Sequence, residues 1–298
     1  MNKFIKTIVV YVMLTLLSML ALDGLYTFVY SNSVARNKVQ YAMNASPKHY
    51  DAIILGSSRA ENHLIPEMFH KSGLNVYNFG MSGGSLCEDS LLLKLFFEKG
   101  NTTDKIILQV DLQFLSEASA EGIQAEFLPY LATNKTIYHH YQDKIENEFG
   151  LAYFPFYRYC KLDSKIGLRE LVITLMKKKA KFYKTNGFVP LDGTLNTNLR
   201  QDLPKVMASK NKYYDEIVAI SKINKVQLIP FIAPFCKYAN NRDFFSKLNH
   251  RIPELHDYSN FIKEDSLFAT CGHLNKKGAA VFTRMIVEQL FGINNMEK

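Results

Sequence analysis

The chain has 298 residues, which is enough for one large α/β domain with a full hydrophobic core and an appendage. Apolar residues make up 47% and charged residues 21%, a composition that excludes a disordered or fibrous protein. The net charge of +8 is spread along the chain apart from the run Lys177–Lys184, which is typical of a solvated helix end. No nucleic-acid-binding motif accompanies this charge, so we expect no DNA or RNA partner.

The N-terminus carries a membrane signal. Two lysines precede an uncharged apolar run, Thr7–Leu22, which with its continuation to Tyr30 is long enough to cross a bilayer. A cleaved signal peptide is the alternative, but no small-x-small cleavage site follows, so we favour an anchor at residues 1–32. The lysines predict a single-pass membrane protein with residues 33–298 outside the cytoplasm. Deletion up to about Ser33 is then expected to leave a soluble folded domain.

Strands and helices alternate after a linker from Ser31 to His49. The expected strands are Asp51–Leu55, Leu74–Asn78, Lys105–Val110, Val226–Ala233 and Tyr258–Ile262, with helices near 60–72, 86–99, 212–224 and 241–248 and a last helix ending near Phe291. This alternation predicts a three-layer α/β/α, flavodoxin-like domain with a parallel sheet. The stretch from about 114 to 210 is too long for a connection. We expect it to form a helical, aromatic-rich insertion, serving as a lid or cleft or simply packed.

A serine and a histidine stand at two informative places. The first strand ends in Gly56-Ser57-Ser58 and a helical pattern starts near Arg59, which places a hydroxyl at the carboxyl end of a strand. In open α/β sheets ligands bind at that edge. Near the C-terminus, His273 lies on a loop just before the last helix.

This order resembles that of the SGNH, or GDSL-like, hydrolases. Gly56–Ser58 is similar to the first block of that family and implies Ser58 as the nucleophile. His273–Asn275, with Gly278, is similar to the fourth block and implies His273 as the base. The resemblance is specific at these two ends of the chain and faint between them.

The two middle blocks concern the oxyanion. Asn78–Gly83 follows the second strand, resembles the second block and implies Gly83 as a backbone donor. The third block has an asparagine after the third strand, and here none is present. The amide of Gln113 is the candidate replacement, although its side chain is longer.

The acid of the family is missing. It lies three residues before the histidine, where this chain has Thr270. The acid of a Ser-His-Asp triad holds the imidazole and stabilises its protonated form. Three alternatives stay open: Asp265 or Asp257 reaches the ring, Thr270 or a backbone carbonyl orients it in a Ser-His dyad, or the site is weak or only binds.

Arg59 and His63 lie beside the serine. Arg59 is a candidate to clamp a carboxylate or phosphate of a substrate, with pairing to Glu61 or Glu88 as the equal alternative. We read His63 as an exposed or capped histidine.

The cysteines have no metal-ligand spacing, so we expect no metal site; they are Cys87, Cys160, Cys236 and Cys271. An exported location permits disulfides, and four cysteines allow three pairings, of which the sequence selects none. We read Cys271 as a small packing residue.

The resemblance implies an SGNH-type esterase or O-acyltransferase that uses no cofactor. The expected substrate is an acylated glycan of the envelope or extracellular side, or another small ester. The alternative is a catalytically silent, membrane-anchored domain that binds glycan or scaffolds an export complex, and a purely structural exported domain is a third reading.

Overall fold

The computed structural model describes residues 2–196 and 200–293, which form two compact units. The first, here called the helical unit, consists of Met1–Ala45 and Glu121–Lys179. The second, the sheet unit, consists of Ser46–Ala120 and Ala180–Lys298. The chain therefore passes between the units three times, and the second segment of the helical unit lies within the expected insertion.

The sheet unit is built on five parallel strands. They are β1 (His49–Leu55), β2 (Val76–Asn78), β3 (Thr102–Gln109), β4 (Gln227–Ile232) and β5 (His256–Asp257). Their spatial order is β2-β1-β3-β4-β5, the order of flavodoxin-type doubly wound sheets. The predicted α/β class and parallel sheet are confirmed. The last strand was misplaced: it has two residues and ends just before the expected Tyr258–Ile262.

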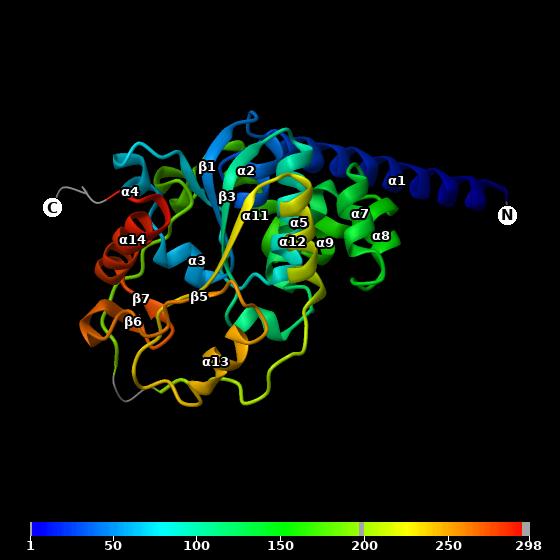
Figure 1. The fold of residues 1–298 in the computed structure, drawn as a ribbon. Helices are drawn as coiled ribbons and strands as arrows, with labels where there is room; N and C mark the ends of the chain where they lie inside the picture. The colour runs from blue at the N-terminus through cyan, green and yellow to red at the C-terminus, as the bar shows by residue number, and fades with distance from the viewer. Residues whose placement is uncertain (1, 197–199, 294–298) are drawn as a thin grey trace. The chain divides into compact units, whose positions relative to one another are not determined.

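Helices cover both faces of this sheet (Figure 1). One face carries α3 (Ser58–His63), α4 (Pro66–Lys71) and α14 (Lys276–Phe291); the other carries α5 (Leu86–Glu98) and α12 (Lys212–Ile223). The remaining elements are α13 (Asp243–Asn249), the 3-10 turns η1 (Leu112–Leu115), η3 (Lys181–Thr185) and η4 (Asp265–Leu267), and an antiparallel ribbon of β6 (Phe268–Thr270) and β7 (His273–Leu274).

Local sequence explains these boundaries. The expected single helix over 60–72 is two helices, because a residue before proline avoids the helical conformation and Pro66 starts a new helix. The first turn of α5 is closed by a capping box between Ser85 and Glu88. The side chain of Asn275 caps α14, and Gly292, at φ +68°, ends it.

The helical unit contains no strand among its described residues. Its elements are α1 (Asn2–Ser31), α2 (Lys38–Asn44), α6 (Glu121–Phe127), η2 (Leu128–Tyr130), α7 (Lys135–Tyr141), α8 (Glu148–Tyr153), α9 (Tyr157–Lys161), α10 (Asp163–Ile166) and α11 (Leu168–Leu175). The expected linker before His49 is thus partly helical, since it contains α2. The side chain of Asn37 caps this helix by accepting a hydrogen bond from the backbone N–H of Gln40.

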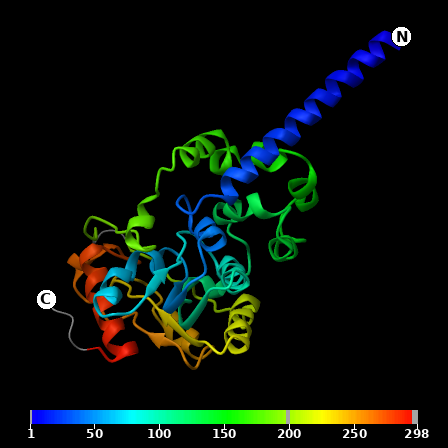
Figure 2. The same cartoon turned by 90° about the horizontal axis from the view of Figure 1, so that it is seen from above.

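Helix α1 has two different halves (Figure 2). Its large apolar residues are exposed from Phe4 to Leu22, and it is the one helix in the described ranges that is long and apolar enough to span a membrane. Its last turns are different, since Tyr26, Val29 and Tyr30 are buried in the helical unit. Deletion up to Ser33 would remove part of this core, so the expectation of a soluble folded domain after such a cut applies to the sheet unit, and for the helical unit we expect a loss of packing.

Candidate active site

Ser58 is positioned by the turn that follows β1. Ile54 and Leu55 are fully buried and are followed by Gly56 at φ +137°, where a Cβ would lie only 2.7 Å from the Cβ of Gln109. A side chain at that position would have to displace Gln109, so glycine is required. The turn is further fixed by Ser57, whose N–H and hydroxyl both donate to Oε1 of Gln109, at 2.8 and 2.7 Å. Ser58 is the next residue and the first of α3.

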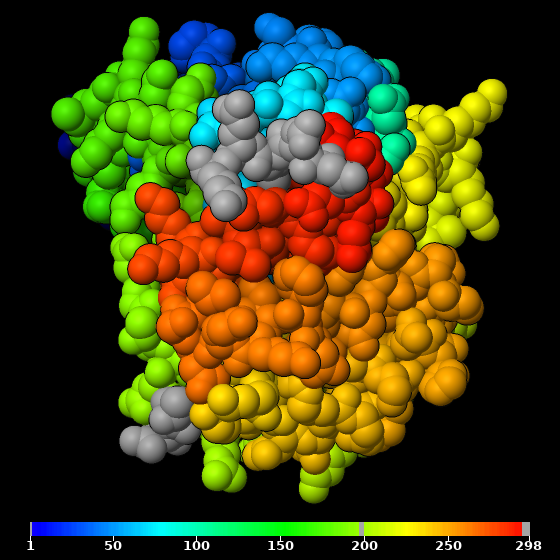
Figure 3. Space-filling model, turned by 60° about the vertical axis from the view of Figure 1, so that its left-hand side comes forward, coloured from blue at the N-terminus to red at the C-terminus, as the bar shows by residue number. Residues whose placement is uncertain are grey.

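His273 is positioned by the short ribbon before α14. It begins β7 and pairs across the ribbon with Thr270 of β6. The neighbouring residue, Leu274, donates its backbone N–H to Nε2 of the buried His63 at 3.0 Å. Figure 3 shows α14 (red) and the orange residues that precede it side by side on one surface of the sheet unit. The expected loop is therefore an ordered ribbon.

The two side chains meet across 215 positions of sequence. The hydroxyl oxygen of Ser58 lies 2.7 Å from Nε2 of His273. Both side chains are half-buried. Ser58 follows the carboxyl end of β1, which lies between β2 and β3; the strand order reverses there, and ligands bind at such a point in open α/β sheets. A hydroxyl at hydrogen-bond distance from a neutral imidazole is the geometry that activates a serine nucleophile.

The other ring nitrogen of His273 contacts Thr270. The Thr270 hydroxyl lies 3.1 Å from Nδ1. Asp257 accepts from the N–H of Ser259, and Asp265 accepts from Tyr238 and pairs with Lys237 at 3.1 Å. No carboxylate in the described part of the chain is hydrogen-bonded to the imidazole. Among the candidate partners of the ring considered from the sequence, the structure therefore has Thr270 at Nδ1.

The imidazole of His273 is held neutral. Burial, and to a smaller extent the nearby guanidinium of Arg59, lower its pKa to about 4, against an opposing effect of Asp111. With Nε2 accepting from Ser58, the proton of the neutral ring lies on Nδ1 and is donated to Thr270. The ring is therefore a proton acceptor at neutral pH.

Arg59 forms a buried ion pair with Asp111. Nε donates to Oδ1 at 2.8 Å, Nη2 lies 2.5 Å from the same oxygen, and the guanidinium lies over the ring of Phe235. The partner is thus neither Glu61 nor Glu88. Asp111 lies two residues after the end of β3 and directly after the strand Lys105–Val110 expected from the sequence, and a charged residue at that place was the sequence signal for this pair.

His63 was misread from the sequence. It is fully buried rather than exposed, and its ring centroid lies 6.0 Å from that of His273. Burial, the neighbouring His273 and Arg59 hold its pKa well below the usual range. Its Nε2 accepts from Leu274, so His63 supports the backbone beside His273.

The two oxyanion candidates differ. Gly83 is exposed at φ +80°, and no residue in the described ranges accepts a hydrogen bond from its N–H. The amide nitrogen of Gln113 donates to the carbonyl of Gly84 at 3.1 Å and to Asp89 at 3.2 Å. Both amide hydrogens of Gln113 are therefore used within the fold, and as placed this side chain offers no donor to an oxyanion.

A disulfide joins Cys236 and Cys271. A backbone hydrogen bond joins the same two residues, since the N–H of Cys236 donates to the carbonyl of Cys271 at 2.8 Å. The reading of Cys271 as a packing residue is wrong: it ties the ribbon that carries His273 to the segment after β4. Cys87 and Cys160 form no disulfide.

One group of possible metal ligands lies at the opposite, amino edge of the sheet. His49, Asp51 and Asp104 have donor atoms within 4.8 Å of one another. The donors already have partners, because His49 contacts Thr102 and Asp104, and Asp51 accepts from Asn75. This group is separate from the Ser58–His273 pair, and we assign it no role.

The fold and the site together define an α/β protein with a serine–histidine pair at the carboxyl edge of its sheet. No family model and no curated protein matches the chain.

Proposed function

We propose that this protein is an SGNH-type esterase or O-acyltransferase that acts on an acylated glycan of the cell envelope or extracellular side. The observation that carries the proposal is the 2.7 Å contact between Ser58 Oγ and His273 Nε2. The order of the two residues along the chain, and the glycine turn that presents the serine, are what the resemblance to this family implies.

In the proposed reaction, Ser58 Oγ attacks the ester carbonyl carbon while His273 Nε2 takes the hydroxyl proton. The negative charge that develops on the carbonyl oxygen is held by the backbone N–H groups of Ser58 and Gly83. The carbon–oxygen bond then breaks, the leaving alcohol takes the proton from Nε2, and the acyl group remains on Ser58. Water or an acceptor hydroxyl attacks the acyl carbon and gives its proton to Nε2; the bond between the acyl carbon and Ser58 Oγ then breaks, and Oγ takes the proton from Nε2, which restores the serine and the neutral imidazole.

Thr270 supplies orientation in this scheme. Its oxygen accepts the Nδ1 proton of His273 and fixes the tautomer that leaves Nε2 free to accept. A neutral oxygen stabilises the imidazolium less than a carboxylate does. We therefore expect slower turnover than in a full triad.

The proposed location is the outer side of a membrane. Lys3 and Lys6 precede the apolar half of α1, which favours an N-terminus in the cytoplasm. The Cys236–Cys271 disulfide supports the same side, because such bonds persist in oxidising compartments.

The alternative is a catalytically silent domain that binds glycan or scaffolds an export complex. Two observations favour it: the acid position is Thr270, and the amide hydrogens of Gln113 are used within the fold.

The test is covalent labelling of the purified full-length protein in detergent. A fluorophosphonate probe and short-chain nitrophenyl esters should react with the protein, and Ser58→Ala and His273→Ala should each abolish the reaction. The double variant should be little worse than either, because the pair acts as one unit. Ser82→Ala, an exposed serine beside Gly83, is the matched control and should label normally. Labelling of the folded protein that does not exceed the Ser58→Ala level, across several acyl lengths, would establish the silent domain instead.

A further inference from the structure

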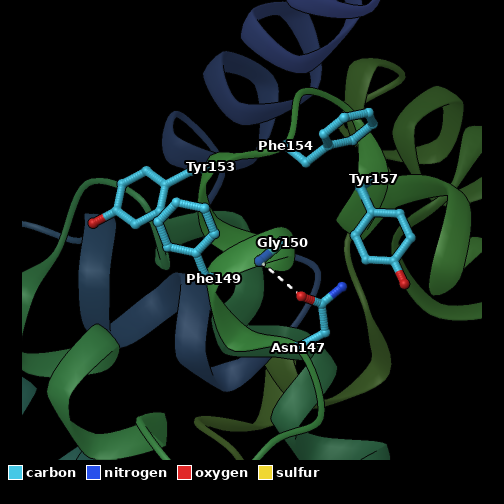
Figure 4. Close-up of a pocket in the computed structure, with 6 residues that line it drawn as sticks. All are labelled: Asn147, Phe149, Gly150, Tyr153, Phe154 and Tyr157. Carbon is cyan, nitrogen blue, oxygen red and sulfur yellow. Dashed lines mark hydrogen bonds between the residues drawn. The ribbon is translucent and has the colours of Figure 1, made fainter.

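The helical unit exposes a cluster of aromatic side chains on α8 and the loop to α9. Phe149, Tyr153 and Phe154 are 66%, 54% and 52% exposed. Together with Asn147, Gly150 and Tyr157 they line an open hollow of about 520 Å³ (Figure 4). Phe149 and Tyr153 lie on one side of it, with ring centroids 5.0 Å apart, and Tyr157 lies on the other. Large exposed aromatic groups gathered in one place mark an interaction surface.

The same segment is fastened to α1 at one point. Asp23 accepts from the backbone N–H of Phe156 and from the guanidinium of Arg158, both at 2.9 Å. Arg158, which is only 2% exposed, also donates to Thr27 at 2.9 Å. The ring centroid of Tyr26 lies 5.0 Å from that of Phe156. The loop between α8 and α9 is therefore held against Asp23, and Phe154 lies only two residues from Phe156.

Asp23 is also where the uninterrupted exposed apolar half of α1 ends; after it Leu25 and Phe28 are still exposed, but Tyr26, Val29 and Tyr30 are buried. The residues from Phe4 to Leu22 have no cover in the helical unit. At about 1.5 Å per residue this stretch, which includes Lys6 near its start, is about 28 Å long. With the Lys6 side chain reaching back to the headgroups, that length is close to the hydrocarbon thickness of about 30 Å. If it fills the bilayer core, Asp23 and the loop that binds it lie at the level of the lipid headgroups. Aromatic side chains with one apolar and one polar end are enriched at that level.

We infer that Phe149, Tyr153, Phe154 and Tyr157 form a membrane-interface surface that inserts into the headgroup layer around the emerging α1. The occupant of the hollow is a phospholipid, with its glycerol and upper acyl carbons against the rings. The inference depends on the contacts of the helical unit alone and is independent of the proposed esterase activity. In this arrangement the helical unit itself contacts the membrane surface, and α1 is not its only attachment to the bilayer.

The test places a fluorescent probe at single positions of the full chain. Tyr153→Cys and Phe154→Cys, each in a Cys160→Ser background, are labelled with an environment-sensitive dye, and the protein is reconstituted in phosphatidylcholine–phosphatidylglycerol vesicles. Met176→Cys is the matched control, because Met176 is apolar and 71% exposed in the same unit. Met176 follows the last residue of α11, close to Lys178, whose carbonyl accepts a hydrogen bond from Arg36. Arg36 comes after the end of α1, so this region is attached beyond the last turn of α1 and not at Asp23.

At positions 153 and 154 we expect severalfold stronger quenching by lipids with a nitroxide on an upper acyl carbon, and severalfold weaker quenching by aqueous iodide, than at position 176. Equal iodide quenching at all three positions in vesicles overturns the inference. So does protection that arises only in native membranes and not with purified lipid, since that result assigns the surface to a protein partner. Circular dichroism and melting of each labelled variant check that the fold is kept.

Discussion

The hydroxyl oxygen of Thr270 lies 3.1 Å from Nδ1 of His273, on the side of the ring opposite Ser58. A threonine oxygen accepts a hydrogen bond but carries no charge. It can therefore hold the orientation and tautomer of the imidazole without stabilising its protonated form, two tasks that one aspartate performs together in a triad.

Removal of this hydroxyl should reduce, but not abolish, the proposed activity. Thr270→Val keeps the shape and loses the acceptor. A neutral hydrogen bond contributes about 1 kcal/mol, so we expect kcat/KM for a nitrophenyl ester to fall by up to about tenfold. Thr270→Ser retains the oxygen and should stay near the original value, whereas Thr270→Asp should raise the rate. Equal activity of all four proteins would assign no role to this contact.

The activity should persist into acid. Because burial and the nearby Arg59 lower the pKa of His273 to about 4, its imidazole stays neutral, and able to accept a proton, down to that pH. The acid limb of the kcat/KM profile should therefore lie near pH 4, below the value of about 6.5 for an ordinary histidine. Thr270→Asp should move the limb to higher pH, since a carboxylate at Nδ1 favours the imidazolium. A limb at the ordinary value in the unchanged protein would contradict the buried, cation-flanked environment.

Stability should fall in acid through the same histidines. The pKa values of His63 and His273 are both lowered in the folded protein, so the unfolded chain binds protons first as the pH drops below about 6.5. The free energy of unfolding then decreases towards pH 4, with a slope of about 1.4 kcal/mol per pH unit for each proton taken up. His63→Gln keeps an acceptor for Leu274 and should flatten this slope by one proton, which urea unfolding at a series of pH values measures. A slope unchanged by the substitution would show that His63 does not titrate in this way.

The disulfide should matter for both stability and activity. Cys236 and Cys271 are 35 positions apart, and closing a loop of that size stabilises a fold by up to about 4 kcal/mol in the chain-entropy model. The double variant Cys236→Ser/Cys271→Ser, or reductant, should lower the urea midpoint and slow labelling of Ser58, because His273 lies two residues from Cys271. Cys160→Ser removes an exposed free thiol and should change neither quantity. If reductant leaves both unchanged in the original protein, the bond does not support the ribbon.

The place of an N-terminal cut should decide whether the helical unit folds. Deletion of residues 2–20 removes exposed apolar side chains and leaves Asp23 with Arg158. Deletion of residues 2–33 also removes Tyr26 and Tyr30, and the loss of one large buried aromatic group typically costs about 3–5 kcal/mol. Only the longer deletion should increase proteolysis and hydrogen exchange across residues 121–179. Equal protection of both shortened chains would mean that this half of α1 is dispensable.

The sequence was most informative where a short pattern determines the chemistry. A buried run, a glycine and a serine predict the strand and turn that present Ser58, and the amphipathic last helix predicts where His273 lies near its start. Both inferences need only neighbouring residues. The parallel sheet was expected from the alternation of strands and helices, and the meeting of these two side chains at one edge from the resemblance to the SGNH hydrolases.

Features that depend on distant partners could not be derived in this way. The pairing of Arg59 with Asp111 and the burial of His63 arise from packing between separate elements. Ribbon strands of two or three residues have no periodicity to detect, so His273 was expected on a loop. From the sequence, Tyr26 and Tyr30 are typical of interfacial anchors, and only their contacts with distant residues such as Tyr159 and Ile166 show that they belong to a protein core.

The ion pair between Asp23 and Arg158 also has a consequence for biosynthesis. The two residues are 135 positions apart, so the carboxylate leaves the ribosome long before its partner is made. If the apolar half of α1 enters the bilayer as proposed, it does so during that interval with an unpaired charge at its border, and moving this charge into hydrocarbon is costly. The later arrival of Arg158 neutralises this charge and joins the inserted helix to the newly made segment. On the proposed membrane location, Asp23 would therefore first limit how far the helix inserts and later join it to the completed helical unit.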